Sequence, residues 1–161
     1  MIRDILFAQK NRQEAILKER YIPRYQTARF EKMMDTKLIK VVLGPRRAGK
    51  SFFATHMFKP GMAAYINFDD EYLVTVKNYE EIIKNALLVY GDTKHLLLDE
   101  VQNISGWELL VNRLQREGYN ILVTGSNSKL LSRELATHLT GRHLPLELLP
   151  FSFKEFLAFR N

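Results

Sequence analysis

Residues 44–51 read Gly-Pro-Arg-Arg-Ala-Gly-Lys-Ser and match the pattern G-x-x-x-x-G-K-[S/T] of loops that bind phosphate groups. Glycines let such a loop turn back sharply, so that successive backbone N–H groups point inward at phosphate oxygens. The positive end of a helix that starts at Lys50 adds to that field. We expect the Lys50 side chain to reach the β- and γ-phosphates of a nucleotide, and the Ser51 hydroxyl to bind Mg²⁺. The predicted binding residues are Gly44, Pro45, Arg46, Arg47, Ala48, Gly49, Lys50, Ser51 and Phe52.

An acidic pair, Asp99-Glu100, follows the apolar run Leu96-Leu97-Leu98. Carboxylates at the end of a buried strand are unfavourable unless a positive group lies near them. We expect Asp99 to hold Mg²⁺ and Glu100 to act as a general base that activates water for attack on the γ-phosphate. The alternative is that the carboxylates only place negative charge at the N-terminus of a helix, or hydrated groups at the end of the strand.

A third polar segment, Thr124-Gly125-Ser126-Asn127, follows the apolar run 121–123. Ligands of parallel sheets gather at the carboxyl ends of the strands. Ser126, or else Asn127, is therefore a candidate to hold the attacking water or to contact the γ-phosphate. Either side chain could instead cap a helix over 128–139.

Five largely apolar segments are expected to form the strands that position these residues. They lie at residues 38–43, 63–68, 95–98, 121–124 and 143–149. Helical patterns separate most of them, and near-continuous apolar strands indicate a sheet that is covered on both faces. The alternation predicts an α/β fold with a parallel sheet and right-handed crossovers.

Two further helices, over residues 2 to about 20 and 24–34, precede the first strand. We therefore divide the chain into an N-terminal helical segment, 1–36, and a core, 37–161. Ser105 with Glu108, and Ser152 with Glu155, have the spacing of capping boxes that begin later helices.

Composition excludes several classes of protein. The chain has 161 residues, of which 46% are hydrophobic and 26% charged, and it has no cysteine, so disulfide scaffolds, thiolate metal sites and cysteine catalysis are excluded. The four histidines lack metal-ligand spacing. The longest apolar runs, such as 86–90, are far too short for a membrane span, and the first residues lack a secretory leader. We expect a cytoplasmic protein that does not interact with membranes.

The net charge of +6 is unevenly distributed, because residues 1–50 hold 13 Lys and Arg against 5 Asp and Glu. A basic front half indicates a polyanionic partner, which is either nucleic acid or the phosphates of a nucleotide. A solvated helix face is the simpler explanation for part of this charge.

Taken together, these motifs resemble AAA+ P-loop ATPases, and more narrowly AAA-domain proteins with a DUF4143 C-terminal region. The stretches that carry the resemblance are Tyr21-Ile22-Pro23-Arg24, residues 44–51, Tyr65 to Asp70, Leu97 to Gln102, Thr124-Gly125-Ser126, Leu139 to Arg142 and Leu149 to Phe156.

The resemblance implies a three-layer α/β/α fold whose five-stranded, mainly parallel sheet has the order 5-1-4-3-2. It implies ATP and Mg²⁺ as ligands, ATP hydrolysis, adenine contacts around Tyr21 to Arg24, and assembly into an oligomer. Arg142 matches the position of an arginine that enters the neighbouring subunit's nucleotide site. Such proteins continue into a helical lid and a C-terminal domain, so we expect residues 1–161 to be a core without its lid.

Two other functions remain open at this point. A P-loop small-molecule kinase would need an acceptor site rich in arginines, for which Arg133 and Arg142 give little support, and Glu100 favours attack by water. A DNA-binding module with a nucleotide switch would use the basic N-terminal half and would lose affinity steeply with salt.

Overall fold

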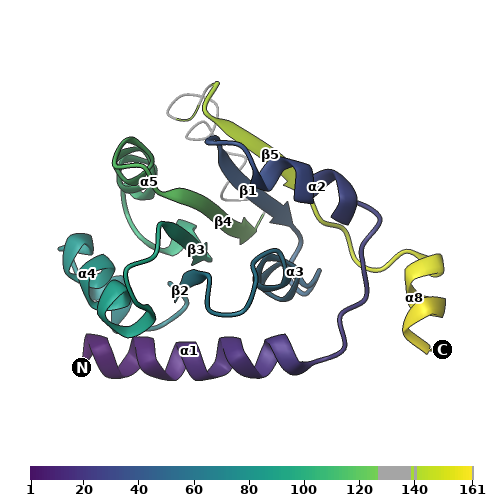
Figure 1. Ribbon diagram of the computed structural model, residues 1–161, viewed down its shortest axis with the longest axis horizontal. Coiled ribbons are helices and arrows are strands. Elements are labelled where there is room, and N and C mark those ends of the chain that lie inside the picture. The colour runs from purple at the N-terminus through teal and green to yellow at the C-terminus, as the bar shows by residue number, and fades with distance from the viewer. Residues whose placement is uncertain (127–138, 140, 161) are drawn as a thin grey trace.

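The computed structural model describes residues 1–126, 139 and 141–160, and it forms a parallel sheet flanked by helices (Figure 1). The strands are β1 (Ile39–Gly44), β2 (Ala63–Asn67), β3 (His95–Asp99), β4 (Asn120–Ser126) and β5 (His143–Glu147). The helices are α1 (Ile2–Lys18), α2 (Thr27–Met34), α3 (Lys50–His56), α4 (Tyr79–Tyr90), α5 (Trp107–Arg116) and α8 (Phe153–Arg160), with 3₁₀ turns at Leu73–Thr75 and Val101–Asn103.

The strands lie in the order β2-β3-β4-β1-β5, and every neighbouring pair is parallel. This confirms the predicted strand order. Because the strands are parallel, the carboxyl ends of β1, β3 and β4 reach the same edge of the sheet. Gly44 pairs with Ser126 there, and Asn67 pairs with Asp99. The three polar segments found in the sequence are therefore brought to one edge.

Two hydrophobic cores cover the two faces of the sheet. Alternate residues of each strand face opposite sides, so Val41 packs with α4 and α5 while Val42 packs with α2 and α3. Burial on both faces explains why the strands read as near-continuous apolar runs. The N-terminal helices contribute to these cores, since Leu6 of α1 and Phe30 of α2 are fully buried. The division of the chain at residue 36 stays a prediction.

Helix α1 covers the free edge of the sheet at β2. It runs alongside β2, α4 and α3 (Figure 1). The Gln9 side chain donates from Nε2 to the Asn67 carbonyl at 3.0 Å and accepts from the Asn67 N–H at 2.9 Å. The amide of Gln9 thus makes the pair of hydrogen bonds that a further strand would make.

Helix ends agree with the sequence in one place and differ in another. The capping box that begins α8 is confirmed, because Glu155 accepts from Ser152 while the Glu155 N–H donates to Ser152 Oγ at 3.3 Å. The box predicted at Ser105 and Glu108 is wrong. Gly106, in a left-handed conformation with φ of 67°, occupies the N-cap of α5, so the helix begins one residue too late for Ser105 to cap it. The helix predicted over 128–139 lies almost entirely outside the described residues.

Within the ranges 1–126 and 141–160, no helix has both the length and the apolar character that crossing a membrane would require.

Candidate functional site

The loop of residues 45–49 begins where β1 meets the segment after β5. A Cβ at Gly44 would lie 2.2 Å from the Leu148 carbonyl oxygen, so only glycine permits this approach. Arg47 and Gly49 both have positive φ, at 67° and 85°, and the Ala48 N–H donates to the Pro45 carbonyl at 3.2 Å. The chain therefore turns back on itself before α3 begins, as the motif predicts. Arg46 and Arg47 are exposed.

Lys50 lies between this loop and the acidic pair. Its side chain is buried, and Nζ donates to the Pro45 carbonyl at 3.2 Å. The same Nζ lies 3.9 Å from Oε1 of Glu100. The ammonium group is thus placed within reach of both halves of the site.

Asp99 joins the loop to the end of β3. Only 1% of this residue is exposed, and its Oδ1 accepts a hydrogen bond of 2.9 Å from Ser51 Oγ. Oδ1 also accepts from Thr124 Oγ1, and Oδ2 accepts from the Tyr65 hydroxyl at 2.8 Å. Burial, together with the neighbouring Asp99 charge, raises the pKa of Tyr65, so the phenol stays protonated and donates.

The donor set around Asp99 fits Mg²⁺. Ser51 and Asp99 offer a hydroxyl and a carboxylate, the hard oxygen ligands that Mg²⁺ prefers. The hydrogen bonds that the Asp99 carboxylate accepts from the described residues come from three uncharged hydroxyls. A buried carboxylate with neutral donors gains most from a cation placed beside it.

Glu100 has an unusual backbone for its residue type. Its φ of 50° and ψ of 42° are left-handed, a conformation that costs a non-glycine residue roughly 1–2 kcal/mol. Its N–H donates to Thr124 Oγ1 at 3.1 Å, and its Oε2 accepts from Gln102 Nε2 at 2.5 Å. These bonds hold the carboxylate at the edge of the site, and strained residues of this kind cluster at functional sites.

The strand β4 contributes a residue that the sequence prediction did not single out. Ser126, the predicted water-binding residue, pairs with Gly44 in the sheet and so lies beside the start of the loop. Thr124 lies two residues earlier on the same face, and its hydroxyl contacts both members of the acidic pair. The alternation of strand residues links Thr124 to Ser126. Asn127, the second candidate, lies outside the described residues.

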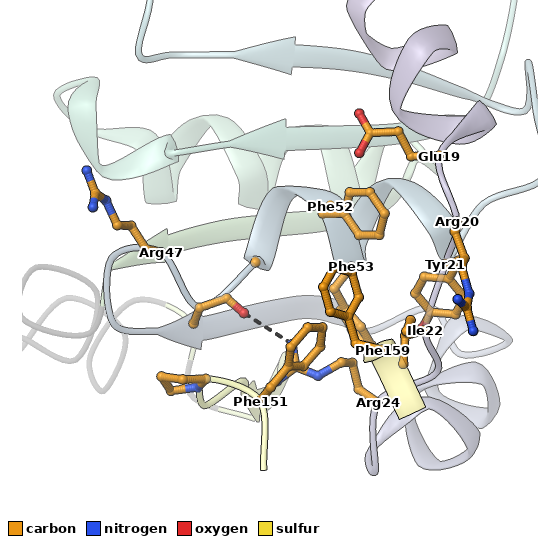
Figure 2. Close-up of a pocket in the computed structure, with 13 residues that line it drawn as sticks. Glu19, Arg20, Tyr21, Ile22, Arg24, Arg47, Phe52, Phe53, Phe151 and Phe159 are labelled. Atoms are coloured by element: carbon orange, nitrogen blue, oxygen red, sulfur yellow. Dashed lines mark hydrogen bonds between the residues drawn. The ribbon is translucent and has the colours of Figure 1, made fainter. Parts of the chain in front are cut away.

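A cavity of about 280 Å³ opens beside the loop (Figure 2). Its wall is mainly aromatic and aliphatic, and it includes Tyr21, Ile22, Phe52, Phe53, Phe151 and Phe159 next to Ala48 and Gly49. The ring of His56 stacks on Tyr21 at 4.7 Å and lies 4.4 Å from Phe52. Arg47 points away from these aromatic side chains (Figure 2).

The cavity joins two distant parts of the sequence. Tyr21, Ile22 and Arg24 line the cavity together with Ala48 and Gly49 of the loop. That the segment Tyr21 to Arg24 contacts a nucleotide base stays a prediction. Phe151 and Phe159, from the segment after β5, form another part of the cavity wall, and the sequence prediction did not assign them to the site. A planar, largely apolar ring is the ligand that such a wall suits.

Arg142 lies away from the other site residues. It is exposed and precedes β5, and its carbonyl accepts from the N–H of Ile39, the first residue of β1. Gly44 and the loop are at the opposite end of β1. Arg142 therefore does not meet the phosphate loop of its own chain.

Curated relatives share the sequence over most of this chain. An uncharacterised protein of Methanocaldococcus jannaschii is 47% identical over 129 residues, which cover 76% of this chain and 29% of that protein. An uncharacterised protein of Haemophilus influenzae is 36% identical over 140 residues, which cover 79% of this chain and 35% of that protein. The chain thus spans about a third of the length of these relatives.

Solved structures with low sequence identity share the fold. The Saccharomyces cerevisiae Hsp104–ADP complex superposes with a TM-score of 0.68 at 18% identity, over 96% of this chain and 25% of that one. AMPPCP-bound DnaA from Aquifex aeolicus gives 0.61 at 18% identity, over 86% and 51%. A Walker-type ATPase of Pyrococcus abyssi gives 0.56 at 17% identity, over 88% and 57%.

The family described as AAA domain matches residues 36–157, from just before β1 into α8. This range holds the phosphate loop, the acidic pair and Thr124, and the parallel sheet has the strand order that the resemblance implied. The chain therefore belongs to the AAA domain family and has the fold of an AAA+ P-loop ATPase.

Proposed function

We propose that this chain is the core of a Mg²⁺-dependent ATPase that acts in the cytoplasm. The observation that carries the proposal is that the phosphate loop and the acidic pair are in direct contact. Ser51 of the loop bonds to Asp99 at 2.9 Å, and Lys50 lies 3.9 Å from Glu100. The groups that would bind phosphate thus lie beside the carboxylate that would act as a base toward water.

The loop and Lys50 bind the phosphates. Backbone N–H groups of the loop residues after Pro45 and the Lys50 ammonium supply positive charge to the β- and γ-phosphates. Ser51 and Asp99 would hold Mg²⁺, which would supply positive charge to the phosphate groups. Tyr65 and Thr124 keep the Asp99 carboxylate oriented through their hydroxyl groups.

Glu100 is the general base. It accepts a proton from the water that attacks the γ-phosphorus, and the β–γ anhydride bond breaks as the new P–O bond forms. The hydrogen bond from its N–H to Thr124 fixes where its carboxylate stands. Ser126, beside Gly44, contacts the γ-phosphate or the water.

The aromatic cavity receives the adenine base. Tyr21, Ile22 and Phe52 provide apolar contacts directly beside the loop residues Ala48 and Gly49. ADP in the Hsp104 structure and AMPPCP in the DnaA structure are adenine nucleotides held by proteins of the same fold, which supports this assignment.

Arg142 acts on a neighbouring copy of the chain. Because it is exposed at the end of β1 opposite from Gly44, it is available to enter another subunit's nucleotide site. An arginine supplied in this way raises turnover about 10³-fold or more in P-loop enzymes. In proteins as long as the relatives, hydrolysis would drive a change in the remaining two-thirds of the polypeptide.

Calorimetry with ATP, ADP and GTP, each with and without Mg²⁺, tests binding, and release of phosphate tests hydrolysis. We expect tighter binding of ATP than of GTP, a Mg²⁺ requirement, and phosphate release without any added acceptor. Strict dependence on an acceptor would show a kinase instead. DNA binding that survives Lys50→Ala, with no nucleotide binding by the unmodified chain, would favour a DNA-binding module.

A further inference from the structure

Arg24 connects three separate segments of the chain. The residue lies between α1 and α2 and is only 7% exposed. Its guanidinium donates to the Ala48 carbonyl of the phosphate loop at 3.1 Å, to the Leu149 carbonyl after β5, and from Nε to Oε1 of Glu155 in α8 at 3.2 Å. One side chain therefore joins the loop to both ends of the segment 149–155. The dashed line in Figure 2 marks its bond to the loop.

Glu155 is saturated with hydrogen bonds. Its Oε1 accepts from Arg24 and from the Tyr25 N–H at 2.8 Å, and its Oε2 accepts from the N–H and the hydroxyl of Ser152. Burial acts to raise the pKa of Glu155, but the bonds from Ser152 and Tyr25 and the Arg24 charge outweigh it and lower the pKa to about 2. The carboxylate is thus ionised at neutral pH and fixes the start of α8 against Arg24.

Helix α8 depends on these polar contacts for its position. None of its residues is buried, and Phe153 is 77% exposed, so α8 has no side chain inserted into either core. The ring of Phe151 packs on the Arg24 guanidinium at 4.6 Å and lies 6.2 Å from the ring of Phe159. Both rings line the cavity beside the loop.

We propose that Arg24 is a positioning residue for nucleotide binding, which, with Glu155, holds the Phe151–Phe159 wall of the base cavity against the phosphate loop. The wall and the loop then move as one unit, so that affinity for the base depends on α8. Binding of the phosphates alone needs only the loop and Lys50. This inference rests on the proposed function, because it presupposes that a nucleotide occupies the site.

Affinity for two ligands separates the role of the wall from that of the loop. Binding of ATP and of inorganic tripolyphosphate, both with Mg²⁺, is measured by calorimetry on the full chain and on Glu155→Gln. The glutamine side chain has one acceptor oxygen where the carboxylate uses two, so it cannot serve both Arg24 and the helix cap. We expect the Kd of ATP to rise about tenfold, which corresponds to the loss of one charged hydrogen bond. The Kd of tripolyphosphate should stay within about twofold.

Two further variants separate the ion pair from the helix cap. Ser152→Ala weakens the cap of α8 but leaves the Arg24–Glu155 pair in place, so its ATP affinity should stay near that of the unmodified chain. Arg24→Lys keeps the charge but cannot reach three acceptors at once. It should lose at least as much ATP affinity as Glu155→Gln, while the Kd of tripolyphosphate should stay within about twofold, because the loop and Lys50 are unchanged.

Hydrogen exchange of the unmodified chain gives a test that needs no variant. ATP should slow amide exchange in 153–160, and tripolyphosphate should not. Equal effects of Glu155→Gln on both ligands, no effect on either, or unchanged exchange in α8 with ATP would each overturn the role of Arg24. Failure of the unmodified chain to bind ATP would instead refute the proposed function.

Discussion

The hydroxyl of Ser51 donates a hydrogen bond to Oδ1 of Asp99, although the strands that lead to these two residues are not neighbours in the sheet. Ser51 follows β1 and Asp99 ends β3, and β4 lies between these two strands. Thr124 of β4 donates to the same carboxylate oxygen of Asp99. The site is therefore built over β4, and three strands must be in register for the carboxylate and the loop to meet.

Lys50 and Glu100 should be separable by mutation. Lys50→Ala removes the buried ammonium group from the loop, so nucleotide binding itself should be lost, whereas Lys59→Ala, at an exposed lysine beyond α3, should bind normally. Glu100→Gln should bind ATP with Mg²⁺ but lower the rate of phosphate release by about 10²-fold or more, because only the base is lost. Equal binding defects in Lys50→Ala and Glu100→Gln would contradict these roles.

Tyr65→Phe should weaken Mg²⁺ binding without affecting the nucleotide alone. The hydroxyl that holds Oδ2 of Asp99 is removed, and loss of such an outer contact typically lowers metal affinity 10- to 100-fold. Titration of Mg²⁺ against phosphate release measures the effect, with ATP binding in EDTA as the reference. Tyr79→Phe removes a hydroxyl that bonds to the Ser105 carbonyl instead of to Asp99, and should behave normally.

Gly44→Ala should lower both stability and ATP affinity. The added Cβ meets the Leu148 carbonyl at 2.2 Å and forces the segment after β5 away from β1. Such overpacking costs about 1–3 kcal/mol in the free energy of unfolding, which urea denaturation measures. At Gly91, with φ of 88°, a Cβ meets nothing within 4 Å, so Gly91→Ala should strain only the backbone. An unchanged ATP affinity in Gly44→Ala would show that the loop does not depend on this contact.

Lys40 should make stability depend on pH in the alkaline range. This fully buried residue of β1 donates to the Thr36 carbonyl and to Asn120 Oδ1, and burial lowers its pKa from 10.5 to about 8, although Asp35 acts against the shift. Between pH 8 and 10.5 the unfolded chain binds more protons at this residue than the folded chain, so stability from Lys40 rises with pH by on the order of 3 kcal/mol.

Urea denaturation of the unmodified chain and of Lys40→Met across this range isolates the effect. The difference in their free energies of unfolding should change in favour of the unmodified chain as the pH rises from 8 to 10.5. A constant difference would mean that Lys40 has the same pKa in the folded and unfolded states.

Arg142→Ala should impair hydrolysis in an assembly while leaving ATP binding unchanged. Mixing it with Glu100→Gln should restore phosphate release, because some interfaces then pair an intact Glu100 with a neighbouring intact Arg142. Arg116→Ala is a matched control, since Arg116 is also exposed and lines the same surface pocket as Arg142. If the mixture is no more active than the two variants separately, Arg142 does not act between subunits.

Much of the fold follows from short-range patterns in the sequence. The apolar run 96–98 and the glycine-rich loop set the ends of β3 and β1, and the capping spacing at Ser152 sets the start of α8. Parallel strands then bring Ser51 and Asp99 together, because both lie at carboxyl ends. The central pair of the site was therefore predictable.

Contacts that depend on the direction of a side chain, or that join residues far apart in the sequence, could not be predicted from the sequence. Tyr65 and Thr124 reach Asp99 only because all three side chains lie on the face that α3 covers, and a motif does not give the register of the sheet. Arg24 bonds to Glu155 across 131 positions in the sequence, which no local pattern reveals. The predicted cap at Ser105 was wrong because Gly106 adopts a left-handed conformation and becomes the N-cap of α5. The sequence pattern does not determine which backbone conformation this one residue adopts.

The pairing of Gln9 with the backbone of Asn67 also protects the molecule from other copies of itself. A free strand edge offers unpaired N–H and C=O groups on which a strand from another chain can add, and this growth leads to aggregation. Helix α1 covers β2 and supplies the missing partner through a side chain, which cannot propagate a ladder further. A chain that lacked residues 1–20 would keep the phosphate loop and the acidic pair yet expose a template for fibrillar association.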